Sequence, residues 1–149
     1  MLVLKQLHKK YGTKQGVDQL DWQLDAGLVY GLVGVNGAGK TTLFRCMAGL
    51  ESFGGSLESR LQPLKNYLGW LPTNPVFMTR MTGAEYLRLC CMARQVSVPD
   101  LQAQNLFDLP LQAYAAQNST GMKKKLALMG LMLQHNRLYL LDEPFNGLD

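Results

Sequence analysis

The chain has 149 residues, of which 47% are hydrophobic and 17% are charged, and 15 of them are glycine. This composition is typical of one globular domain and excludes a disordered protein. The net charge of +4 suits an anionic ligand but is too small to indicate nucleic-acid binding by itself. Three cysteines, Cys46, Cys90 and Cys91, favour a reducing compartment over a disulfide framework. No apolar run reaches about 18 residues, so no membrane-spanning helix is predicted.

The first part of the chain predicts three strands. Residues 2–7 alternate loosely between apolar and polar, and residues 17–24 alternate clearly, which indicates a strand with one buried and one polar face. Residues 26–34, AGLVYGLVG, are nearly all apolar. Such a run is typical of a strand buried on both faces in a parallel sheet covered by helices.

A helix and two short strands follow. Residues 40–50 place Leu43, Met47 and Leu50 at helical spacing, with Gly49 as a late break. Short strands are predicted around residues 55–59 and 67–71.

The second half of the chain predicts mainly helix. Residues 82–92 begin with Thr82 as N-cap and Glu85 three residues later. Further helices are expected at 100–107 and 121–133, and 137–142 predicts a second fully buried strand. A strand, a glycine loop, a helix, a helical insert and another apolar strand together indicate an α/β fold.

Residues 34–41, GVNGAGKT, match the phosphate-loop pattern G-x-x-x-x-G-K-[ST] in full. In such a loop successive backbone N–H groups curl around phosphate oxygens, and side chains would obstruct them. Lys40 would bring a cation to the β- and γ-phosphates, and the hydroxyl of Thr41 would reach Mg²⁺. A chance match in a glycine-rich turn is disfavoured, because an apolar run precedes it and a helix follows. The predicted nucleotide-binding residues here are Asn36, Gly37, Ala38, Gly39, Lys40, Thr41 and Thr42.

Two acids, Asp142 and Glu143, follow the second apolar strand. Ligands of open α/β sheets bind at the carboxyl ends of the strands. We therefore expect Asp142 to hold the Mg²⁺ shell and Glu143 to orient or polarise the attacking water as the catalytic residue. The alternative is a pair of solvated acids at the start of a loop, which would be preferred without a phosphate loop in the same chain.

With these motifs in this order, the chain resembles the nucleotide-binding domain of the ATP-binding-cassette family, most closely its bacterial exporter-type members. LYLLDEP at 138–144 and the phosphate loop are two marks of that family. NGLD at 146–149 is similar to its D-loop, and NSTGMKK at 118–124 is similar to its signature segment. KKYG, with Tyr11, resembles its adenine-stacking loop, and the resemblance covers essentially the whole chain.

The resemblance implies the cofactors, partners and remaining site residues. ATP would stack its adenine on Tyr11 beside Val17, with Mg²⁺ at its phosphates. Ser119 and Gly121 would contact the γ-phosphate held by a second nucleotide-binding domain, in a head-to-tail dimer. The partner it implies is a separate integral membrane transporter subunit, which would hold the protein on the cytoplasmic, inner face of the cell membrane. No nucleic-acid partner is expected.

The resemblance also implies a domain organisation. Residues 1–72 and 134–149 would form the ATP-binding core, and 73–133 a helical subdomain with the signature segment. An N-terminal antiparallel part would accompany the parallel sheet. Family members continue past the D-loop into a strand with a switch histidine, which neither His8 nor His135 matches. We therefore expect an incomplete domain, 1–149, from a longer one of about 200 residues that lacks its C-terminal strands. The alternative is a naturally short member.

Several residues depart from the family pattern. Thr73 stands where the family has a glutamine that reaches Mg²⁺ and the water, and Thr120 and Met122 replace the usual glycine and glutamine of the signature. Lys123 to Lys125 lie in the first turn of a helix, where cations oppose the macrodipole. A bound anion would reverse that cost, and a solvated charge run is the alternative.

Three functions remain open at this point. The first is the ATP-hydrolysing subunit of a transporter. The second is a nucleotide-binding remnant without turnover, which Thr73 and the early end of the sequence favour. The third is a soluble ATP-binding-cassette protein acting on ribosomes or nucleic acid, although the long insertions or basic arms of such relatives are lacking in this sequence.

Overall fold

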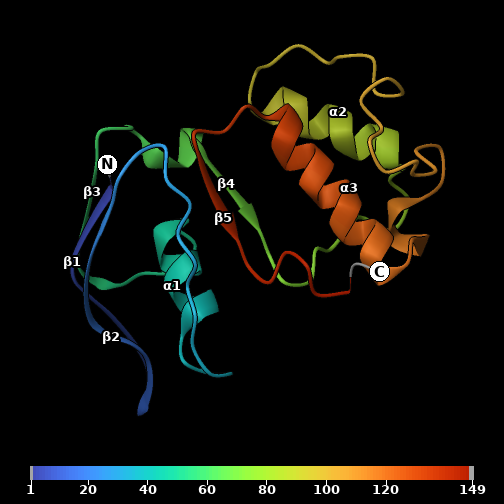
Figure 1. The fold of residues 1–149 in the computed structure, drawn as a ribbon. Helices are drawn as coiled ribbons and strands as arrows, with labels where there is room; N and C mark the ends of the chain where they lie inside the picture. Colours follow the sequence, from blue (N-terminus) through green and yellow to red (C-terminus); the bar gives the residue numbers. More distant parts are fainter. Residues whose placement is uncertain (1, 148–149) are drawn as a thin grey trace. The chain divides into compact units, whose positions relative to one another are not determined.

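The computed structural model describes residues 2–147 (Figure 1). The chain divides into two compact units, one extending to Leu68 and the other from Gly69 onward. Within residues 2–147, no helix combines the length and the apolar character needed to cross a membrane.

The first unit contains a three-stranded antiparallel sheet with the strand order β2-β1-β3. The strands predicted at 2–7, 17–24 and 55–59 are thereby confirmed. β2 has its polar residues exposed and Leu24 buried, as the alternation requires. The unit also holds one α-helix and one short 3₁₀-helix. Its elements are β1 (Leu2–Tyr11), β2 (Lys14–Leu24), α1 (Lys40–Met47), β3 (Gly54–Ser59) and η1 (Leu64–Asn66).

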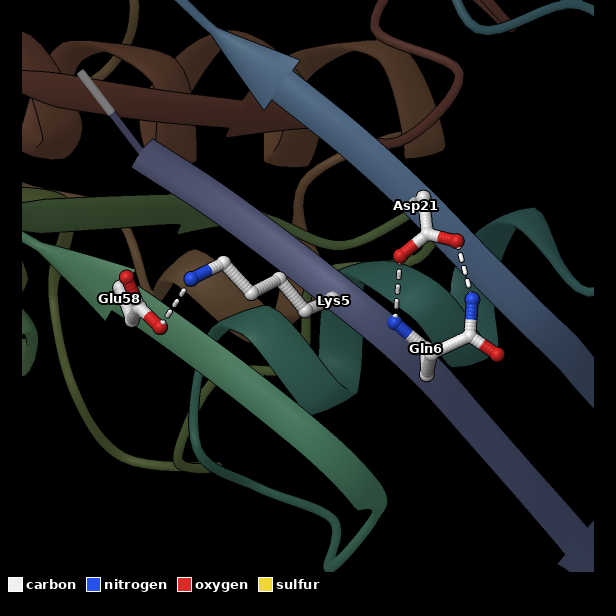
Figure 2. Close-up of polar contacts among 4 residues, drawn as sticks. All are labelled: Lys5, Gln6, Asp21 and Glu58. Atoms are coloured by element: carbon white, nitrogen blue, oxygen red, sulfur yellow. Dashed lines mark hydrogen bonds and ion pairs between the residues drawn. The ribbon is translucent and has the colours of Figure 1, made fainter.

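Polar side chains hold the sheet together where the register of β1 shifts. Between Leu4 and Leu7 the pairing with β2 is irregular, and Gln6 has a positive φ of 49°. Asp21 on β2 accepts a hydrogen bond of 2.8 Å from the backbone N–H of Gln6, and its other oxygen accepts one from the Gln6 side-chain amide (Figure 2). The bulge therefore leaves this N–H with a partner. On the other side of β1, exposed Lys5 pairs with Glu58 of β3 at 2.8 Å.

Residues 26–34 do not form the predicted buried strand. In the described part of the chain this segment is not hydrogen-bonded into either sheet, and Val29 and Val33 are almost fully exposed. A strand exists only beside a hydrogen-bonded neighbour. The apolar run was therefore not sufficient for a strand, because within residues 2–147 neither sheet extends to this segment.

Helix α1 ends just before Gly49, the residue that was predicted to break it. Gly49 has a φ of 73°, and the N–H groups of Gly49 and Leu50 donate to the carbonyls of Cys46 and Arg45. These bonds form the Schellman motif that closes many helices with a glycine. Leu43 and Met47 are buried as expected, but Leu50 lies beyond the break and is exposed.

The second unit contains a two-stranded sheet, β4-β5, and two packed helices (Figure 1). The strand predicted at 67–71 and the helices predicted at 82–92 and 121–133 are confirmed. Buried residues from α2, α3 and the segment between them form one core: Ala84, Leu87, Leu101, Leu109, Leu111, Ala115, Leu126 and Met129. The elements are β4 (Leu68–Leu71), α2 (Gly83–Ala93), η2 (Ala115–Gln117), α3 (Thr120–Leu133) and β5 (Leu138–Leu141).

The start of α2 has the predicted capping box. The Thr82 hydroxyl accepts a hydrogen bond from the backbone N–H of Glu85, and the Glu85 carboxylate accepts one from the backbone N–H of Thr82. Each side chain thereby satisfies a backbone donor that the helix leaves unpaired.

Two predictions for this unit were wrong. Residues 100–107 form turns and no helix, because side chains compete for the backbone. Asp100 accepts hydrogen bonds from two N–H groups of its own turn, and Asn105 bonds both the N–H and the carbonyl of Leu109. Strand β5 exists, but it is not fully buried: Leu140 is covered, whereas Tyr139 and Leu141 on the opposite face are exposed.

The three cysteines are free thiols with buried side chains. Burial raises the pKa of each thiol. Because the thiolate is the reactive form, these cysteines are poor nucleophiles.

Candidate functional site

The phosphate loop is a tight turn that leads directly into α1. Gly37 and Gly39 have φ angles of 83° and 93°, and the helix begins at Lys40 with Gly39 as its N-cap. No side chain caps this helix end. Its first N–H groups, together with those of the loop, are the donors that suit a phosphate anion, and the positive end of the helix dipole adds to the attraction.

The side chain of Lys40 folds back over the loop. Its ammonium donates to the carbonyl of Gly34 at 2.6 Å and to that of Val35 at 3.0 Å. The N–H of Ala38 closes the same turn by donating to Val35 at 3.1 Å. The loop therefore carries its cation at its own centre, within reach of any phosphate that the backbone donors bind.

The phosphate loop touches the β1–β2 hairpin at Gly39. A Cβ atom on Gly39 would overlap the carbonyl oxygen of Gly16 and lie 3.6 Å from Cγ2 of Val17. A Cβ atom on Gly16 would in turn lie 3.1 Å from Cγ2 of Thr42 and 3.2 Å from the ring of Tyr11. The structure thus brings Tyr11 and Val17 beside the phosphate loop inside the first unit.

Tyr11 stands at the end of β1 with its ring about half exposed. The ammonium of Lys9 lies 5.1 Å from the ring centroid, which is a cation–π distance. An exposed aromatic ring next to a phosphate loop is positioned to stack on a planar base.

Asp142 is held from two sides in the second unit. Its backbone N–H donates to the carbonyl of Leu71 at 2.9 Å, which continues the pairing of β4 with β5. The hydroxyl of Thr73 donates to Oδ2 of Asp142 at 2.9 Å. The carboxylate is only 3% exposed. Thr73 thus orients the carboxylate that we expect to serve a metal ion.

Glu143 follows immediately and faces solvent. Its φ of 49° is in the left-handed region, where a non-glycine residue is strained. The side-chain amide of Asn146 donates to its Oε2 at 3.1 Å. The turn therefore holds an exposed carboxylate in a defined direction directly after a buried one.

Lys124 itself fits neither interpretation of the lysine run. Its side chain is 1% exposed, so it belongs neither to a solvated charge run nor to an open anion site. Its ammonium donates to the carbonyl of Glu143 at 2.7 Å and to that of Asn146 at 2.8 Å. Lys123 and Lys125 are half-buried.

Ser119 and Gly121 form the first turn of α3. Ser119 is the N-cap, and its hydroxyl accepts a hydrogen bond from the N–H of Met122 at 3.2 Å. A Cβ atom on Gly121 would lie 2.6 Å from the carbonyl oxygen of Gly147, so the signature-like segment packs against the turn after β5. Leu148 and Asp149, the rest of the D-loop-like segment, lie outside the described residues.

The predicted site residues thus fall into two groups. Tyr11, Val17 and residues 36–42 lie together in the first unit, and Ser119, Gly121, Asp142 and Glu143 lie in the second. The meeting of the two groups around one nucleotide stays a prediction. Within residues 2–147, no cluster of three His, Cys, Asp or Glu side chains is placed to hold a metal. Thr41 in the first unit and Asp142 in the second each carry an oxygen of the kind that Mg²⁺ binds. A shared role at one metal ion stays a prediction.

Sequence reasoning missed three contributors to these groups. Gly16 had a readable signal, since a glycine inside a strand often marks the close approach of another backbone. The role of Lys124 could not be predicted, because the sequence of three adjacent lysines does not reveal which side chain is buried. The hydrogen bond from Asn146 to Glu143 has the three-residue spacing of a turn, but only the fold reveals the direction of that side chain.

The chain is similar to known proteins in sequence and in fold. The family model described as "ABC transporter" matches residues 17–146. The bacitracin transport ATP-binding protein BcrA of Bacillus licheniformis is 31% identical over 96% of this chain and 51% of its own length. The ABC-type transporter ATP-binding protein EcsA of Bacillus subtilis is 30% identical over the whole of this chain and 66% of its own length.

Among solved structures, one titled "Structure of ATP binding subunit of ABC transporter" matches with a TM-score of 0.82 and 30% identity. The match covers 99% of this chain and 68% of that one. The chain spans about half to two thirds of the length of the first curated relatives that it matches.

Proposed function

Because the chain belongs to the ABC transporter family, we propose that it binds MgATP and hydrolyses it to drive a separate membrane subunit. The observation that carries this proposal is the junction of hairpin and phosphate loop in the first unit. There the ammonium of Lys40 lies on the loop's own carbonyls at 2.6 and 3.0 Å, and the ring of Tyr11 stands beside the same loop. One junction therefore offers a cation, backbone donors and a stacking surface.

In the proposed complex the polyphosphate lies along the loop at 36–42. The N–H groups that follow Gly37 and Gly39 donate to its oxygens, and Lys40 transfers its hydrogen bonds from the two carbonyls to the phosphates. Tyr11 would stack on the adenine, and Val17 beside it would contact the nucleotide. A bound Mg²⁺ supplies charge neutralisation at the phosphates, and Thr41 and Asp142 are the residues that would hold it.

Hydrolysis in this proposal depends on the second unit. Glu143 accepts a proton from the attacking water, and its exposed carboxylate is directed by Asn146. Thr73 is too short to contact the water as a glutamine would. It acts through Asp142, whose buried carboxylate it orients.

The proposal includes a dimer and a membrane partner. Two copies, or one copy and a related domain, would bind head to tail so that Ser119 and Gly121 contact the γ-phosphate held by the other. The protein would then work at the cytoplasmic face of a membrane through its transporter partner. The names of the related proteins support this proposal, since the matched relatives are transport ATP-binding proteins.

Two substitutions test the proposal in the purified chain. Lys40→Ala removes the ammonium, and we expect the affinity for a fluorescent ATP analogue to fall about 10- to 100-fold, as for a lost charge-assisted hydrogen bond. Glu143→Gln removes the proton acceptor, and we expect phosphate release to fall about 10²- to 10⁴-fold while nucleotide binding persists. Unchanged nucleotide affinity in Lys40→Ala would contradict the binding site.

A non-hydrolysing nucleotide-binding protein is the second candidate. The hydrogen bond from Thr73 to Asp142 favours it, because that hydroxyl is directed to the carboxylate instead of to a water. The same assay separates the two functions. Tight nucleotide binding that needs Lys40, with no phosphate release even at high protein concentration, would select the second candidate.

A further inference from the structure

Lys124 is the one lysine of the described residues whose side chain is almost completely buried, at 1% exposure. Removing an ammonium from water is costly, so lysine is rarely buried without partners. The burial of Lys124 therefore requires hydrogen-bond acceptors close to its ammonium. Its neighbours Lys123 and Lys125, which are only half-buried, do not share the requirement.

The partners of Lys124 lie at the two ends of one turn. Its ammonium donates to the carbonyl of Glu143 at 2.7 Å and to that of Asn146 at 2.8 Å. The turn between them closes with a hydrogen bond from the N–H of Asn146 to the carbonyl of Glu143 at 3.2 Å. A single ammonium therefore binds the carbonyl of the strained residue Glu143 and the carbonyl three residues later, and it keeps the turn compact.

The first turn of α3 contacts the same segment at a second point. A Cβ atom on Gly121 would lie 2.6 Å from the carbonyl oxygen of Gly147, so the helix backbone and the turn are in close contact there. Ser119 caps the helix just before this point. The helix start and the turn after β5 are thus joined through the backbone at Gly121 and through the side chain of Lys124.

We propose that Lys124 is a positioning residue that links the signature-like helix start to the turn carrying Glu143, so that the two move as one piece. Its consequence for catalysis depends on the function proposed above. In a head-to-tail dimer Ser119 and Gly121 serve the nucleotide of the other copy, whereas Glu143 serves the chain's own. Lys124 then makes the position of the catalytic carboxylate depend on whether the signature-like segment is engaged.

The test is hydrogen exchange of the backbone amides, which needs no hydrolysis. In Lys124→Met the side chain keeps its bulk and loses its donors, and the carbonyls of Glu143 and Asn146 each lose a hydrogen bond. We expect the amides of Glu143 and residues 145–147 to exchange about tenfold faster or more, while those of α2 stay unchanged. Lys124→Gln, which retains two N–H donors, should restore part of the protection.

Lys123→Met is the matched control, because it makes the same change one residue earlier in the same helical turn. It should leave exchange at Glu143 and residues 145–147 unchanged. Equal exchange of these residues in Lys124→Met and the unmodified chain would overturn the proposal. So would a general rise in exchange across both helices, or failure of both Lys124 variants to fold, since each would show a role in overall stability alone.

Steady-state kinetics of ATP hydrolysis then test whether this link affects catalysis. Where the unmodified chain releases phosphate, Lys124→Met should lower kcat about tenfold or more with little change in KM for ATP, and Lys124→Gln should recover part of kcat. A rise in KM at unchanged kcat would contradict the positioning role. If the unmodified chain binds ATP without hydrolysing it, the proposed function fails while the exchange experiment still decides the role of Lys124.

Discussion

The phosphate loop and the turn after β5 hold their functional groups in opposite ways. The loop is formed by the absence of side chains: Gly39 has no room for a Cβ atom against Gly16, and no side chain caps the helix that follows. The turn depends on side chains from distant residues. Thr73 comes from 69 residues earlier to reach Asp142, and Lys124 comes from 19 residues before Glu143.

This difference shows where each region is vulnerable. Added atoms should damage the loop, because its backbone is already in contact with the hairpin. Removed donors should damage the turn, because its strained backbone and the buried carboxylate of Asp142 are stabilised by hydrogen bonds from Lys124 and Thr73.

Gly39→Ala should have the largest effect. The new methyl group would overlap the carbonyl of Gly16, and alanine at a φ of 93° is strained as well. We expect the free energy of unfolding of the loop-containing unit to fall by about 2–5 kcal/mol. Binding of a fluorescent ATP analogue should be lost, and chemical denaturation measures the stability.

Gly37→Ala is the control for that experiment. Gly37 has a similar φ of 83°, but a Cβ atom there would meet no atom within 4 Å. Only the backbone strain remains, so the cost should be about 1–2 kcal/mol. Equal costs for the two substitutions would show that contact with the hairpin does not shape the loop.

Thr73→Val tests the turn by removing a donor at nearly constant volume. Asp142 would lose a hydrogen bond of 2.9 Å to its buried carboxylate, which should lower the free energy of unfolding by about 1.5–3 kcal/mol. Mn²⁺ binding to the nucleotide complex, followed by electron paramagnetic resonance, should weaken as well. Thr73→Ser keeps the hydroxyl and should behave like the unmodified chain. If valine and serine behave alike, the hydroxyl does not orient the carboxylate.

The capping box of α2 should give the smallest effect, because its polar groups are exposed. The hydrogen bond from the backbone N–H of Thr82 lowers the pKa of Glu85 below the ordinary glutamate value. A lowered pKa in the folded state stabilises the protein above the ordinary pKa, and this stabilisation is lost as the pH falls through the lowered value.

Glu85→Gln keeps a hydrogen-bond acceptor but does not titrate. It therefore isolates the contribution of Glu85 ionisation to the free energy of unfolding. The difference in the free energy of unfolding between the unmodified chain and Glu85→Gln should be constant near neutral pH and shrink below the ordinary glutamate pKa. Thermal melts across that range measure it. A difference that grows toward acid would reverse the assigned sign.

Local patterns predicted the elements whose stabilising contacts lie close in the chain. The Thr82 cap, the glycine that ends α1 and the alternation of β2 were all readable, because a helix end or a strand face is determined by residues a few positions apart. The α/β class, with its phosphate loop, is confirmed by the solved structure that matches at 30% identity. The apolar run at 26–34 failed as a strand because pairing is a property of two segments.

In the candidate site, too, residues defined by local spacing could be predicted, whereas long-range contacts could not. Gly37, Gly39 and Lys40 were found from their spacing, since a loop that exposes its N–H groups to phosphate needs those residue types in that order. The burial of Lys124 was beyond sequence reasoning, because three adjacent lysines differ only in which direction the helix points each of them.

By itself the sequence determined a phosphate loop before a helix, an acidic pair after a strand and the class of the fold, because these depend on residue types at short spacing. Only the tertiary structure decided that Gly16 contacts the loop, that Thr73 donates to Asp142 and that Lys124 binds the turn at Glu143. Each of these joins segments that are separated along the chain, and each contact exists only after the unit that contains it has folded.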